Sequence, residues 1–122
     1  MKDLLISILE TFCPNNVYLQ GSLNPDEAYP AKFITFFVPT TDDIAFYSND
    51  VSAVEWTFNV MFYSTNPAEV NTIPAQISKA LKSAGFIPQG KGNDLICDKP
   101  THTGWAMNFL YRENINDQIL SL

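Results

Sequence analysis

The sequence predicts an α+β two-layer sandwich, in which two helices cover one face of a mostly antiparallel sheet of four to six strands. The first observation is the stretch from Val54 to Ser64, where the even positions are apolar and the odd positions are mostly polar or amphipathic. This period of two indicates a strand with one face on a core. The second observation is a single helical stripe of apolar residues in each of the segments 2–12 and 67–84. At about 3.3 Å per residue the strand 54–64 reaches about 35 Å, so we expect it to be central, with both helices on its even-numbered face.

Length and composition restrict the class of protein. The chain has 122 residues, which suggests one domain, and 46% of them are hydrophobic, which is too many for a disordered chain. The formal net charge is −6, and the seven cations are scattered, which argues against a groove for nucleic acid. We expect no transmembrane helix, because no apolar run of about 18 residues occurs, and no signal peptide.

The first half of the chain alternates one helix with several strands. The helix 2–12 ends at Cys13-Pro14, because a residue before proline avoids the helical conformation. A short strand is predicted at 17–20 and a second strand at 31–38. The second strand is apolar on both faces, so we expect helices or another subunit to cover both of them. Residues 39–43 are predicted to turn and 44–47 to form a short edge strand.

The second helix begins at a recognisable cap. Asn66 is suited to the N-cap, Pro67 to the first helical position and Glu69 to the third. Pro74 leaves two alternatives open: a separate turn over 67–72 precedes the main helix, or one helix kinks at Pro74. Gly85 is the expected residue after the helix end.

The remaining elements complete the predicted order α-β-β-β-α-β-β over residues 1–113, in which the short edge strand 44–47 is not counted. The segment 86–88 leaves the helix, 90–92 is a tight loop, and 94–98 is a short strand. A final strand at 105–112 alternates as regularly as the central one. We expect the tail 114–122 to form a short amphipathic helix, to strap onto a neighbour, or to fray.

Catalytic and metal-binding patterns are weak, and we predict no enzyme, no cofactor and no metal site. His102 is expected to be a solvated loop histidine, and a Cys97–His102 nucleophile and base pair lacks a visible oxyanion hole. The segment Gly90-Lys91-Gly92 is not followed by the Ser or Thr and the helix of a phosphate loop. We expect Cys13 and Cys97 to be free, buried thiols.

The acidic segment that carries Asp42, Asp43 and Asp50 also lacks a metal-site pattern. Its spacing differs from that of a calcium loop, so a solvated acidic hairpin is the simpler interpretation. These three carboxylates nevertheless concentrate negative charge in one segment.

Apolar residues exceed what one small subunit obviously covers, which predicts a partner. We expect the odd-numbered face of the central strand, with Glu55, Met61 and Tyr63, to meet a neighbouring subunit or a lumen. On this interpretation Met61→Asp or Tyr63→Asp leaves the monomer folded but weakens assembly. The apolar tail residues Ile115, Ile119 and Leu120 are further candidates for the subunit interface.

The order of several short motifs resembles the tail terminator, or tail completion, proteins of tailed phages and Gram-positive prophages. The resemblance covers roughly residues 15–112 and depends on the order and spacing of the motifs rather than on any single one. The motifs are Val17-Tyr18-Leu19-Gln20-Gly21-Ser22-Leu23, Ala28-Tyr29-Pro30, Phe33-Ile34-Thr35, Phe62-Tyr63-Ser64 with Pro67, Ala84-Gly85-Phe86, Gly90-Lys91-Gly92-Asn93-Asp94 and Asp98-Lys99-Pro100-Thr101-His102-Thr103-Gly104. The chain departs from the family at Val38-Pro39, where an aromatic–asparagine pair is expected, and at Trp105, where a basic residue is expected.

The resemblance implies a structural virion protein of the tail or neck, made in the bacterial host cytoplasm. Such subunits form a hexameric ring that caps the tail tube, joins it to the head-side connector or head-closure protein, and lets DNA pass without specific binding or contact with a membrane. The alternatives are another connector or head-completion subunit and a small-ligand-binding domain. Our candidates for the bore or tube contact are Asp42, Asp43, Asp50, Asp98, Lys99 and His102.

Overall fold

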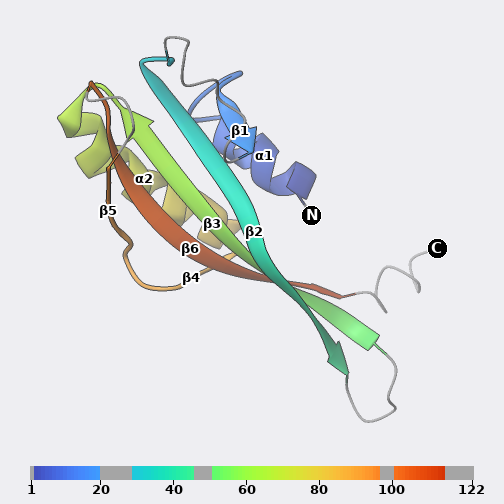
Figure 1. Cartoon of the computed structure of the whole chain (residues 1–122). Helices are drawn as coiled ribbons and strands as arrows, with labels where there is room; N and C mark the ends of the chain where they lie inside the picture. Colours follow the sequence, from blue (N-terminus) through green and yellow to red (C-terminus); the bar gives the residue numbers. More distant parts are fainter. Residues whose placement is uncertain (1, 20–28, 46–50, 97–100, 115–122) are drawn as a thin grey trace.

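The computed structural model describes residues 2–19, 29–45, 51–96 and 101–114. Within these ranges it has two helices and a six-stranded, mixed but mostly antiparallel open sheet (Figure 1). The elements are α1 (Lys2–Glu10), β1 (Val17–Leu19), β2 (Lys32–Ala45), β3 (Val51–Ser64), α2 (Pro67–Ser83), β4 (Ile87–Pro88), β5 (Asn93–Ile96) and β6 (Thr103–Asn114). The predicted α+β class is confirmed, and the order of elements differs only by the additional strand β4.

The sheet has β3 at its centre, as its long alternating pattern predicts. The strand order is β1-β2-β3-β6-β4, and β5 also pairs with β6. β1 is parallel to β2, and the other described pairs are antiparallel. Figure 1 shows α1 and α2 on the same side of the sheet, which leaves its other side, here called the helix-free face, without a helix from the described residues.

The main core lies between the helices and the even-numbered side of β3. Val60 is flanked in register by Phe36 of β2 and Met107 of β6, so side chains of three strands line up on one face. Leu9 of α1 and Ile77 of α2 are fully buried against this face. Both helical stripes are therefore used to cover the even face of β3, as the sequence indicates.

The ends of α2 follow the predicted capping residues. Asn66 Oδ1 accepts a hydrogen bond from the Ala68 backbone N–H at 3.0 Å. At the other end Gly85 has φ of 100°, and the Phe86 N–H donates to the Leu81 carbonyl at 3.0 Å, as in a glycine-terminated helix. Of the two alternatives at Pro74, the structure has a single helix that continues through this residue.

The structure corrects the prediction for residues 39–45, which continue β2 instead of forming a turn and a new strand. Phe37 pairs with Asn59 and Thr40 with Thr57, so Val38 and Pro39 together lie opposite one residue of β3. This is a β-bulge, and Pro39 is tolerated in it because a bulge interrupts the hydrogen-bond ladder. β1 pairs with β2 only from Ile34 to Phe36, so within the described strands Pro39 also lies on an edge. Residues 46–50 lie outside the described ranges.

The expectation for Cys13 is confirmed, since its thiol is free and the residue, which follows the end of α1, is buried. Burial raises the pKa of this thiol to about 11; the nearby Lys32 lowers it and Glu69 raises it, both by smaller amounts. Cys97 lies outside the described residues.

Candidate functional site

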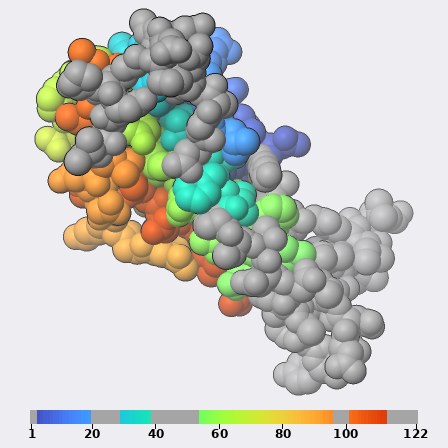
Figure 2. Space-filling model, viewed as in Figure 1, coloured from blue at the N-terminus to red at the C-terminus, as the bar shows by residue number. Residues whose placement is uncertain are grey.

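The helix-free face carries the residues that the sequence assigns to a subunit contact, arranged in rows across β2, β3 and β6. The row at one end joins Phe33, Tyr63 and Gly104, and the row at the other end joins Asp42, Glu55 and Arg112. Between them lie the rows Thr35–Met61–Ala106, Phe37–Asn59–Asn108 and Thr40–Thr57–Leu110. The face thus changes from aromatic through polar to charged along the strands. Figure 2, viewed from the same side as Figure 1, shows atoms of these strands at the surface.

The aromatic end forms a second, smaller core around Phe33, here called the Phe33 cluster and made of Tyr18, Tyr29, Phe33, Tyr63 and His102. Phe33 is 2% exposed and stacks on Tyr63 with 4.9 Å between ring centroids. Tyr29 meets Phe33 edge-on at 5.4 Å, and Tyr18 does so at 6.4 Å. Edge-to-face and offset-stacked rings at these separations are favourable. Phe33 therefore packs within its own subunit on the face where the sequence suggested helices or a neighbour.

His102 belongs to this cluster, which corrects the prediction of a solvated loop histidine. Its side chain is 7% exposed, and its ring lies 5.7 Å from that of Phe33. Its Nε2 is 2.7 Å from the Pro30 carbonyl oxygen and its Nδ1 is 2.9 Å from Thr101 Oγ1. A carbonyl can only accept, so Nε2 carries the hydrogen and donates it. His102 thus ties the turn before β6 to the segment before β2.

Met61 and Tyr63 are less accessible than a free interface requires. Met61 is 5% exposed, so Met61→Asp would bury a charge and destabilise the monomer instead of testing assembly alone. The Tyr63 ring covers Gly104 so closely that a Cβ there would meet its Cδ1 at 2.7 Å. Met61→Asp is therefore unsuited to separate assembly from folding, whereas the effect of Tyr63→Asp at its half-buried position stays a prediction.

Charge gathers at the opposite end of the same face. Glu55 Oε2 accepts a hydrogen bond from Arg112 Nε at 3.1 Å, and the two residues are register partners. Asp42 is the register partner of Glu55 on its other side, whereas Asp43, the next residue of β2, is the register partner of Val54 and does not belong to this row. The Arg112 side chain is 62% exposed, so this ion pair lies at the surface.

The other predicted contact residues, Asp50, Asp98, Lys99, Ile115, Ile119 and Leu120, lie outside the described ranges. Their placement stays a prediction. The structure therefore brings together Glu55 with Asp42 at one end of the face and Met61, Tyr63 and His102 at the other.

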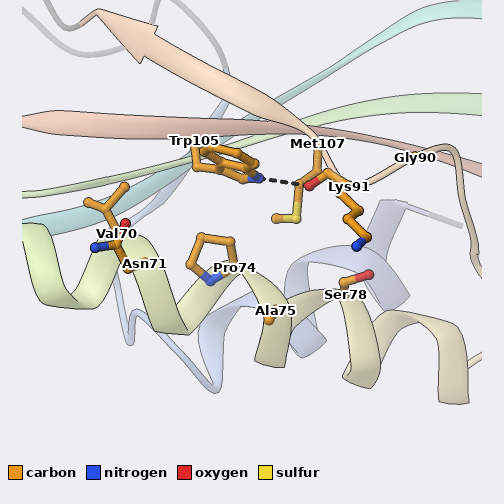
Figure 3. Close-up of a pocket in the computed structure, with 9 residues that line it drawn as sticks. All are labelled: Val70, Asn71, Pro74, Ala75, Ser78, Gly90, Lys91, Trp105 and Met107. Carbon is orange, nitrogen blue, oxygen red and sulfur yellow. Dashed lines mark hydrogen bonds between the residues drawn. The ribbon is translucent and has the colours of Figure 1, made fainter.

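A groove that the sequence does not predict lies on the helix side, between α2 and the loop before β5 (Figure 3). Its volume is about 470 Å³. It is lined by Val70, Asn71, Pro74, Ala75, Ser78, Gly90, Lys91, Trp105 and Met107. Figure 3 shows the Trp105 indole facing Pro74 across the groove, with the Lys91 amine above Ser78. The groove thus combines an aromatic and apolar floor with a cationic rim.

The loop at the rim is fixed by one side chain and one glycine. Trp105 Nε1 donates to the Lys91 carbonyl at 2.9 Å. Gly92 has φ of 99°, and a Cβ on it would lie 2.3 Å from the Ala106 carbonyl oxygen, so only glycine allows the loop to pack this closely. Pro74 has no N–H, so the Val70 carbonyl in the groove wall lacks its ordinary helical donor.

Two sequence signals could have indicated the groove. Pro74 is unfavourable inside a helix, and Gly90-Lys91-Gly92 brings two flexible positions around one cation. Neither signal by itself indicates a groove, because the contact between loop and helix depends on the tertiary structure.

Comparison with known proteins gives no assignment: no family model and no curated protein matches the chain. Neither described helix is long and apolar enough to cross a membrane. Among the described residues, no three His, Cys, Asp or Glu side chains gather closely enough to hold a metal ion.

Proposed function

We propose that this chain is the ring-forming tail terminator subunit of a tailed phage or prophage, which caps the tail tube and joins it to the head-side connector. The observation that carries the proposal is the shape of the sheet. Figure 1 shows the far ends of β2 and β3 extending well beyond the layer of α1 and α2. A sheet that projects past its own covering helices presents backbone and side chains to a neighbour.

The two ends of the molecule also differ, as a ring requires. Closure by rotation uses two different surfaces on each subunit, one meeting the other on the next copy. The projecting ends of β2 and β3 provide one surface, and the body, with α2 and the groove, provides another of different chemistry. These unlike surfaces favour a head-to-tail contact over a contact of one surface with itself.

The charge of the chain suits a ring through which DNA passes. Each copy carries a formal charge of −6, and Asp42 and Asp43 lie in the projecting part of β2. A bore lined by carboxylates repels phosphates and lets the genome slide without specific binding.

The proposal is tested with tail tubes assembled in the absence of a terminator. Purified chain is added to tube protein of the same phage, and tubes are examined by negative-stain electron microscopy. We expect a ring on one tube end and a narrow distribution of tube lengths. Tubes of unregulated length without an end structure at saturating chain would refute the proposal.

A further inference from the structure

We infer that the groove between α2 and the Gly90–Lys91 loop binds the tip of the β2–β3 hairpin of a second copy of this chain. The inference deepens the proposed function, because it names the surface that one subunit offers to the next. It follows from the chemistry of the groove and from where the register places the tip.

The groove is built to hold an aromatic side chain beside a carboxylate. The Trp105 indole, the Pro74 ring and Met107 form an apolar slot, and Lys91 provides a cation at its rim. Slots lined by aromatic and apolar side chains with one charged group are typical of binding sites. An aromatic ring between Trp105 and Pro74 would gain offset stacking as well as burial.

Cations outnumber carboxylates around the groove in a chain that is acidic overall, although Asp94, the register partner of the lining residue Trp105, is also exposed there. Lys79 and Lys82 are exposed on α2 and follow the groove residues Ala75 and Ser78 by one turn. With Lys91, three cations therefore lie on the two segments that form the groove. An occupant with several carboxylates is therefore favoured on grounds of charge.

Two segments of this chain combine aromatic and acidic residues outside the main core. One is 26–29, whose Tyr29 is already engaged in the Phe33 cluster. The other is 42–50, where Phe46 and Tyr47 are flanked by Asp42, Asp43 and Asp50. This second segment comprises the last residues of β2 and the five residues that connect β2 to β3, and it is here called the tip of the β2–β3 hairpin.

The tip cannot reach the groove of its own subunit. Met107 in the groove is the register partner of Val60, and β3 runs from there to Val51 before the tip begins. Nine residues of paired strand span about 30 Å. The hairpin points away from the groove over this distance, so the occupant belongs to another copy.

The experiment measures binding of a fluorescein-labelled peptide of residues 41–51 by fluorescence anisotropy. The receptor is the full chain with Phe46→Ser and Tyr47→Ser, which prevents the tips of other receptor copies from competing with the peptide for the groove. We expect saturable binding that Ala75→Glu in the receptor weakens at least tenfold. The matched control Gln76→Glu, on an exposed neighbour that does not line the groove, should change the dissociation constant less than twofold.

Two further variants separate the contribution of the aromatic side chains from that of the Lys91 charge. A peptide with both aromatic residues replaced by serine should bind with at least tenfold lower affinity, because it lacks the side chains that fill the slot. Lys91→Glu, on an exposed loop outside any helix, should weaken binding about threefold to tenfold and tests the groove even if Ala75→Glu disturbs α2. The inference is overturned if the serine peptide binds as well as the native one, or if neither groove variant weakens binding.

The outcomes distinguish the inference from the proposed function. A stable ring of the full chain that persists with Ala75→Glu and Lys91→Glu overturns the inference and leaves the ring proposal intact. Groove-dependent peptide binding by a chain that forms no ring supports the inference and counts against the ring.

Discussion

Replacing Phe33 tests whether the helix-free face has a real second core. Phe33 is 2% exposed and its ring contacts those of Tyr18, Tyr29, Tyr63 and His102. Truncation of a buried Phe to Ala typically costs about 3–5 kcal/mol, from lost burial and from the cavity left behind. We therefore expect Phe33→Ala to lower the free energy of unfolding by about 4 kcal/mol. That is a large share of the roughly 5–15 kcal/mol that stabilises a domain.

The assay is urea unfolding followed by far-UV circular dichroism, with thermal unfolding as a second measure. At about 4 °C per kcal/mol for a chain of this size, Tm should fall by roughly 15 °C. Phe37→Ala is the matched control, since Phe37 lies four residues further along the same face of β2 and is only half-buried. It should cost about 1 kcal/mol. Equal costs for the two variants, or a cost below 1 kcal/mol for Phe33→Ala, would refute the second core.

Three further results are expected. His102→Phe keeps the ring but removes the donor to Pro30, and should cost about 1–2 kcal/mol in urea unfolding; an unchanged midpoint would contradict the tie between the two segments. A double-mutant cycle with Glu55→Gln and Arg112→Met should give a coupling free energy below about 1 kcal/mol that decreases in 0.5 M salt, because the ion pair is exposed. A larger coupling that salt does not change would show that a partner buries the ion pair. Because the pKa of Cys13 is raised in the native state, the native thiol keeps its proton at a pH where the unfolded thiol loses it, so its contribution to stability is intact below pH 9 and is lost between pH 9 and 11. Cys13→Ala should therefore flatten the decline of the free energy of unfolding in this window. Identical pH profiles for the two proteins would exclude this role.

Local sequence patterns were sufficient to predict most of the fold. The alternation from Val54 to Ser64 identified β3 and its buried face, because a period of two is a property of the strand itself. Asn66, Pro67 and Gly85 located the ends of α2, since capping depends on adjacent residues. These elements needed no knowledge of their neighbours.

The errors arose where a distant contact overrides a local signal. Pro39 suggested a turn, but pairing with β3 continues the strand across it through a bulge. His102 has the sequence context of a solvated loop, yet Pro30 and Phe33 bury it from another part of the chain. The groove was missed for the same reason, because Trp105 and Pro74 meet only after the sheet and α2 have packed.

The central claim is that the chain assembles into a closed ring through two unlike surfaces. Native mass spectrometry of the full chain, at micromolar concentrations and low ionic strength, tests it most directly. The account predicts one discrete oligomer of six copies, without a ladder of open-ended species. A monomer at every concentration, or a symmetric dimer that grows no further, would contradict it.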